Sequence, residues 1–173
     1  MKSIVIGLVI FMLSLPAFAQ TQTKAAQPQT QTQPKAAKPG AAGQDAEFKA
    51  LIAKYYEGWN TLNPDNVASF YAKEGTLVFY DLTPLQYKGW QAYKQGVVQV
   101  FQTFSTMKLV PNNDLKVTKR GKVAWTTMTF HVSAAKKDGT KIEADGRHTA
   151  VWEKKGGKWL IVHEHVSAPL PEA

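Results

Sequence analysis

The sequence predicts an α+β domain in which N-terminal helices pack on one face of a curved antiparallel sheet. In residues 45–62 and 90–107, apolar side chains recur at spacings of three and four, the period of a helix that lies on a core. From residue 109 onward the pattern changes to period two, and the sequences KRGK, KKDG and KKGG divide it into strand-length pieces. Helices followed by consecutive hairpins are typical of the α+β class.

The expected elements follow in order along the chain. A helix starts at Asp45, a residue type that caps helices, and stops at Asn63-Pro64. A short helix begins with Pro64 in its first turn, where the missing amide costs nothing. A strand covers residues 75–81 and a third helix covers 90–107. Four strands are expected at about 109–118, 121–134, 140–153 and 158–167.

The first 44 residues differ in composition from the rest. Residues 1–19 combine Lys2, an apolar run over 4–15 and the small-residue site Ala17-Phe18-Ala19, which predicts a cleaved secretory signal peptide. Its apolar run is too short to span a membrane, so no membrane contact is expected after cleavage. Residues 20–44 contain no aromatic or branched aliphatic side chain, which predicts a disordered linker. We therefore expect a periplasmic or secreted protein with one folded domain over 45–173.

The composition excludes several classes of chemistry. The 173-residue chain has no cysteine, hence no disulfide, thiolate nucleophile or thiolate metal ligand. Without the four lysines of the first 44 residues, 17 basic residues face 13 acidic ones, a net charge of +4. The remaining lysines gather in turns such as Lys136-Lys137 rather than alternating with aromatic residues, so nucleic-acid binding is not expected.

Hairpin register decides which histidines share a face. Two-residue turns at Asp138-Gly139 and Lys155-Gly156 would place Trp152 opposite both Trp125 and Trp159, and His148 opposite Thr129 and His163. On that register one sheet face collects the four histidines, which are the candidate catalytic residues: His131, His148, His163 and His165. They could move protons near neutral pH or could simply satisfy a polar pocket wall.

A pocket is expected between the first helix and the sheet. Its expected lining consists of aromatic and hydroxyl side chains: Tyr55, Trp59, Tyr80, Trp90, Trp125, Thr127 and Thr129. His163 and His165, two residues apart on one strand, have a spacing that can chelate a metal. Since Glu164 points to the other face and no carboxylate supports them there, no metal and no cofactor are expected.

The C-terminal segment GRHTAVWEKKGGKWLIVHEHVSAP carries a family resemblance, supported by Trp59-Asn60, FYAKEGTLVFYD and Gly89-Trp90. It resembles the SnoaL-like branch of the nuclear transport factor 2-like superfamily, which includes ketosteroid isomerases and the calcium/calmodulin-dependent kinase II association domain. The resemblance implies a cone-shaped (cystatin-like) fold with an internal pocket and a homodimer formed through the sheet. Two pocket arginines of the kinase domain correspond here to Ala150 and Val166, so a carboxylate-binding pocket is not expected.

The resemblance leaves two functions open. The first is binding of a small amphipathic or aromatic molecule, with or without isomerase- or hydrolase-type acid–base turnover. An isomerase of this superfamily needs an aspartate base and donors to an oxyanion, for which Tyr55, Tyr80, Asp81 and Asp145 are available without a clear alignment. The alternative is a non-catalytic homo-oligomeric assembly module, similar to the kinase association domain.

Overall fold

The computed structural model describes residues 41–170, so the predicted signal peptide and residues 20–40 of the predicted linker lie outside the described part. Helix α1 spans Ala41–Trp59 and thus begins before the expected cap Asp45. The 3-10 helix η1, Pro64–Phe70, has proline in its first turn and is capped by the Asn63 side chain, which accepts the Asp65 N–H. No helix among residues 41–170 is long and apolar enough to cross a membrane.

The remaining elements form a sheet and one further helix. The strands are β1 (Val78–Tyr80), β2 (Tyr87–Lys88), β3 (Phe104–Pro111), β4 (Lys116–Arg120), β5 (Val123–Lys136), β6 (Lys141–Lys155) and β7 (Lys158–Ser167), and helix α2 spans Gly89–Phe101. The expected helix over 90–107 is therefore shorter, because its last residues join β3. The expected strand over 109–118 is divided between β3 and β4, and β2 was not expected.

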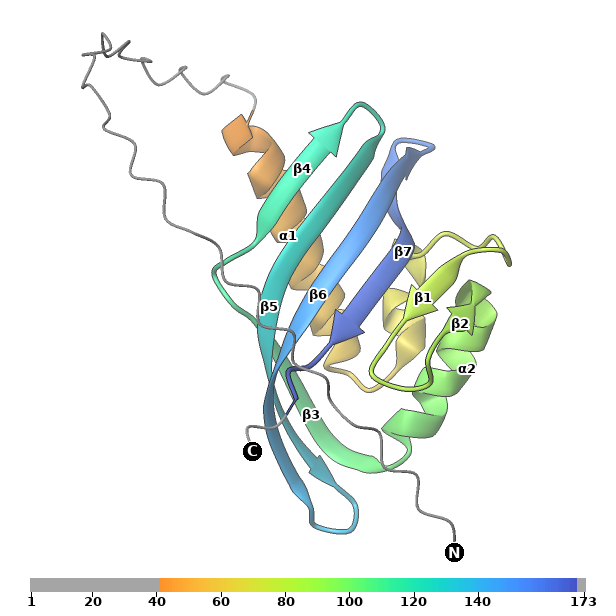
Figure 1. Cartoon of the computed structure of the whole chain (residues 1–173), viewed down its shortest axis with the longest axis vertical. Coiled ribbons are helices and arrows are strands. Elements are labelled where there is room, and N and C mark those ends of the chain that lie inside the picture. Colours follow the sequence, from red (N-terminus) through yellow and green to blue (C-terminus); the bar gives the residue numbers. More distant parts are fainter. Residues whose placement is uncertain (1–40, 171–173) are drawn as a thin grey trace, which may run out of the picture. The chain divides into compact units, whose positions relative to one another are not determined.

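The strands form one curved, open sheet in the order β2-β1-β7-β6-β5-β3, and β4 pairs with β5 next to β3. All pairs are antiparallel except β1 with β7. Helix α1 runs across one face of this sheet, and α2 lies beside β2 (Figure 1). We call the helix-covered face the inner face and the opposite one the outer face. The α+β prediction is confirmed.

Strands β5 and β6 pair one residue away from the predicted register. Ala124 lies opposite Trp152 and Met128 opposite His148. The cause is the turn: the Lys136 N–H donates to the Thr140 carbonyl at 2.8 Å, which closes a three-residue loop with Gly139 at φ 90° instead of a two-residue turn. Since a shift of one residue reverses the faces, Trp125 lies on the outer face and Trp152 on the inner face.

Strands β6 and β7 also differ from the predicted register. The turn lies at Gly156-Gly157, both with positive φ (56° and 81°), so Trp152 pairs with Ile161. A β-bulge then inserts Val162 as an extra residue, after which Glu164 pairs with Ala150 and His148 with Val166. The prediction that all four histidines share one face is therefore wrong. The alternation that places Glu164 opposite to His163 and His165 is correct.

Candidate functional site

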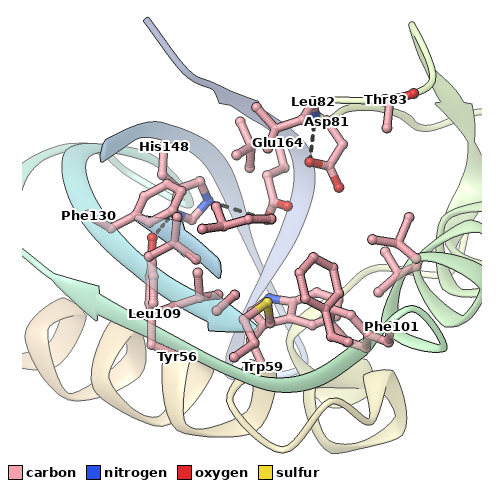
Figure 2. A pocket seen from close by; sticks show the side chains of 18 of the residues that line it. Tyr56, Trp59, Asp81, Leu82, Thr83, Phe101, Leu109, Phe130, His148 and Glu164 are labelled. Atoms are coloured by element: carbon pink, nitrogen blue, oxygen red, sulfur yellow. Dashed lines mark hydrogen bonds and ion pairs between the residues drawn. The ribbon is translucent and has the colours of Figure 1, made fainter. Parts of the chain in front are cut away.

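A cavity of about 260 Å³ lies between α1, α2 and the inner face of the sheet. Its walls are mostly apolar and aromatic, and its polar groups gather at one end, near Asp81, His148 and Glu164 (Figure 2). The lining residues are Tyr55, Tyr56, Trp59, Asp81, Leu82, Thr83, Tyr93, Val97, Val100, Phe101, Phe104, Met107, Leu109, Phe130, Val132, Ala134, Ile142, His148, Glu164 and Val166. An apolar cavity with a few convergent polar groups is the usual form of a small-molecule site.

The segment after β1 forms one side of the cavity. Leu82 and Thr83 line it but are exposed to solvent, as is Val100 at the end of α2. In contrast, the polar side chains His148 and Glu164, which lie deeper in the cavity, have almost no exposure. The cavity is thus open to solvent on the side of residues 82–83.

Glu164 is a fully buried carboxylate held by three phenols. Tyr55 and Tyr71 donate to its Oε2 at 2.6 and 2.9 Å, and Tyr93 donates to its Oε1 at 2.8 Å. Tyr55 comes from α1, Tyr93 from α2 and Tyr71 from the extended residue after η1, so two helices and this segment converge on one strand residue. The bulge at Val162 makes this possible, because it turns Glu164 toward the helices.

The surroundings keep Glu164 ionised and the phenols neutral. Burial pushes the pKa of Glu164 up, but the contact and charge of His148 and the hydrogen bonds from Tyr55 and Tyr93 outweigh it and hold the pKa below its ordinary value. Burial, followed by the nearby Glu164 charge, raises the pKa of Tyr55, Tyr71 and Tyr93 well above 10.0. These phenols therefore act as hydrogen-bond donors and not as bases.

His148 links the Glu164 cluster to the cavity wall. Its Nδ1 lies 3.3 Å from the Tyr56 hydroxyl and its ring stacks on Tyr55 with centroids 5.5 Å apart. Its Nε2 lies 3.3 Å from Glu164 Oε2, within ion-pair range, but without the angle of a hydrogen bond. Among the described residues, this buried nitrogen thus has an ionic neighbour and no hydrogen-bond partner.

Asp81 is the second carboxyl group of the cavity. It follows the last residue of β1, and its Oδ1 accepts the Leu82 N–H at 2.7 Å. Burial, reinforced by the charge of Glu164, raises its pKa from 3.8 to about 6, and the Leu82 N–H only partly offsets this. Asp81 is therefore the carboxyl group of the cavity that gains and loses a proton near neutral pH.

The structure brings together three of the predicted site residues. Tyr55, Trp59 and His148 line the cavity. Trp90 is buried behind it, stacked on Tyr71 with ring centroids 4.3 Å apart. The other four predicted lining residues face outward and do not line this cavity: Tyr80, Trp125, Thr127 and Thr129.

The other three candidate catalytic histidines lie on the outer face. His131 Nδ1 and Nε2 each lie 2.9 Å from a carboxylate oxygen, of Asp145 and Glu143 respectively. His163 Nδ1 donates to the Val78 carbonyl at 2.7 Å, and the Tyr80 ring contacts both His163 and His165 edge-on. Within residues 41–170 no group of three or more metal-ligating side chains is arranged to hold an ion.

The sequence pattern did not identify the main polar residues of the cavity. Strand alternation alone places Glu164 on the face away from the predicted pocket, because the bulge is invisible in the sequence, and Tyr56 and Tyr93 are not among the predicted lining residues. One signal was present: a carboxylate inside the run WLIVHEHV occupies a buried strand, and a buried carboxylate requires donors. The tyrosines of both helices are the donors that this rule demands.

Comparison with known proteins agrees with this architecture. No curated protein matches the chain. A nuclear transport factor 2-like superfamily protein from Salmonella enterica serovar Typhimurium is 21% identical, with TM-score 0.69, over 76% of this chain and 95% of its own. A Xanthomonas campestris protein assigned as a calcium/calmodulin dependent protein kinase II association domain is 26% identical, with TM-score 0.64, over 84% and 100%.

A third solved structure, from Streptomyces avermitilis and assigned as a dehydratase of the same superfamily, is 16% identical with TM-score 0.63, over 76% of this chain and 100% of its own. At that identity the likeness concerns the fold. The family model of the SnoaL-like domain matches residues 48–171, which include every residue that lines the cavity. The chain therefore belongs to the SnoaL-like domain family.

Proposed function

We propose that this protein binds a small organic molecule whose apolar, aromatic body fills the cavity and whose polar group lies against Asp81, His148 and Glu164. The observation that carries the proposal is the cavity itself, a mostly apolar space with its polar groups at one end. A core that served stability alone would be packed without such a space. A histidine and a charged carboxylate beside this space would fix the orientation of a ligand.

The same groups support proton transfer as the chemistry. Asp81, whose pKa is about 6, can accept a proton from a bound molecule at neutral pH, while the phenols of Tyr55, Tyr56 and Tyr93 stay protonated as donors. The Tyr55 and Tyr93 protons are already donated to Glu164, so Tyr56 is the phenol available to a ligand. A base and a neutral phenol donor in one cavity suit an isomerisation or an elimination that passes through an oxyanion. At saturating ligand, Asp81→Asn should then abolish turnover.

Binding can be tested by filling the cavity. Ala134 of β5 lines it, so Ala134→Met should lower the affinity for any ligand at least tenfold, because the longer side chain occupies the space. The matched control is Ala135→Met, one residue along the strand and on the outer face, which should leave affinity unchanged. Thermal shift and tryptophan fluorescence with a panel of aromatic compounds provide the measurement. Equal binding by both variants would contradict the proposal.

Large exposed side chains on the outer face favour a homodimer formed through the sheet. Such a dimer is also what the alternative function, a non-catalytic assembly module, requires. Tyr80 and Trp125 are each 38% exposed there, and Val123 is 37% exposed, which is unusual for large side chains on a sheet face. Trp125→Ser should convert the dimer to a monomer in light scattering without affecting ligand binding. A monomeric wild type would contradict the dimer.

We also propose that the protein is exported, which mass spectrometry of the mature N-terminus would test.

A further inference from the structure

We propose that the cavity selects ligands that carry a cationic nitrogen, held against the Asp81 carboxylate, and rejects anionic ligands of the same shape. The inference rests on the proposed function, because it specifies the polar group of the same ligand. It is drawn from the charges around the cavity and from the way each of them is already satisfied.

The lining contains two carboxyl groups and no lysine or arginine among the described residues. The nearby lysines are engaged elsewhere: Lys94 pairs with Asp65, and Lys73 lies over the Trp90 ring at 4.3 Å from its centroid. His148 is the basic group of the lining, and it faces Glu164. An anionic ligand would therefore meet two carboxylates without a compensating lysine or arginine.

Only one of the two carboxylates has acceptor capacity to spare. Glu164 accepts three phenolic hydrogen bonds and neighbours His148, so its charge is already compensated within the protein. Asp81 accepts the Leu82 N–H and lies near the Tyr93 hydroxyl, whose proton is already donated to Glu164, and it lines the cavity on its solvent-open side. Figure 2 shows its carboxyl group projecting into the cavity at the end where Glu164 lies. Asp81 is thus the group that a ligand cation would neutralise.

The aromatic walls suit the same ligand class. Trp59, Tyr93 and Phe101 line the cavity, and the faces of such rings attract ammonium groups as well as apolar bodies. A neutral ligand that covers Asp81 removes its water and offers no charge in return, whereas an ammonium group replaces the lost solvation. For ligands that share one aromatic body, we therefore expect the affinity to fall in the order amine, alcohol, carboxylate.

The affinities of a neutral ligand and of a cationic ligand should change with pH in opposite directions. Asp81 is faced by Glu164 from β7, His148 from β6, Tyr93 from α2 and Tyr87 from β2, and its pKa in the free protein is about 6. A neutral ligand favours protonated Asp81, so its affinity should fall as pH rises through about 6. A cation favours ionised Asp81, so its affinity should rise over the same interval.

The test uses naphthylmethylamine, naphthylmethanol and naphthoate, which share one aromatic body and differ in charge. Calorimetric titration of the full mature chain from about pH 5 to about pH 8 gives the dissociation constants. At neutral pH we expect the amine to bind at least tenfold more tightly than the alcohol and naphthoate to bind more weakly than both. Asp81→Asn should reduce the preference for the amine to less than about threefold, while Asp145→Asn, the same change on the outer face, should retain it.

Each possible result supports or overturns the preference for cationic ligands. A preference for the alcohol or naphthoate, or an amine affinity that falls with rising pH, would overturn the charge inference while leaving the ligand-binding function intact. The same holds if Asp81→Asn, shown by circular dichroism to be folded, keeps the full preference for the amine. If none of the three compounds binds, and none protects the protein thermally, the proposed function fails and the charge inference falls with it.

Discussion

Replacing Glu164 by glutamine tests the central claim about the cavity, that a charged carboxylate is held there by three phenols and a histidine. The substitution preserves shape and removes the charge. One amide oxygen can still accept from Tyr55 and Tyr71, but the amide NH2 then faces the Tyr93 hydroxyl, which must turn to accept, and His148 loses its ionic neighbour. Glu164→Gln therefore weakens every contact of this group.

The loss of stability expected for Glu164→Gln follows from the burial of Glu164 beside His148. Breaking a buried ion pair by removing one partner destabilises proteins by about 3–5 kcal/mol, because the remaining group is left without compensation. For a folded part of this size, that corresponds to a fall in Tm of about 10–20 °C. Urea denaturation followed by circular dichroism, with an unchanged m value as the condition for comparison, measures the loss directly.

The matched control is Glu143→Gln. Glu143 lies on β6, accepts from Ser133 and contacts His131, but its side chain is 64% exposed on the outer face. Solvent screens such a pair, so the control should leave Tm nearly unchanged. Similar losses in the two variants, or a more stable Glu164→Gln protein, would refute the reasoning. Since the pKa of Glu164 is depressed in the folded state, its contribution should persist above its unfolded value, 4.5, and vanish as pH falls through the folded value.

Substitutions at Asp81 and Gly146 test the charge and the packing of the cavity. Because the pKa of Asp81 is raised in the folded state, ionising Asp81 lowers the free energy of unfolding as pH rises from about 4 to about 6. Asp81→Asn should therefore raise the free energy of unfolding by about 1–2 kcal/mol at neutral pH and leave it unchanged at about pH 4. Urea titrations at both pH values measure the difference. A methyl group on Gly146 would lie 2.2 Å from the Phe130 ring, which lines the cavity. Gly146→Ala should thus cost about 1–3 kcal/mol in thermal unfolding and weaken ligand binding, and an unchanged Tm would contradict this packing.

The helices and strands were predictable because their signals are local. The stripe that includes Phe48, Tyr55 and Trp59 required a helix, and the glycine-containing turns required hairpins. The errors occurred at element ends, where tertiary contacts compete with periodicity. Residues 104–107 fit the end of a helix by pattern, but they pair with β5 and become part of β3.

The candidate site was predictable only in part, because it depends on register. Tyr55 and Trp59 line the cavity, since a helix fixes which residues face the sheet whatever the strands do. The prediction that all four histidines share one face is wrong, because a hairpin loop one residue longer than assumed, together with the Val162 bulge, reverses strand faces and turns His148 alone of the four inward. Neither feature leaves a distinct mark on the composition of its strand.

By itself the sequence determined the fold class, the SnoaL-like resemblance and the aromatic face of α1, because each rests on spacing between neighbours in the chain. Only the tertiary structure decided that Glu164, and not His163 or His165, faces the cavity beside His148 and Asp81. The physical reason is that a strand offers two equivalent faces, and the choice between them is made by hydrogen bonding to the next strand and by the phenols that compensate a buried charge.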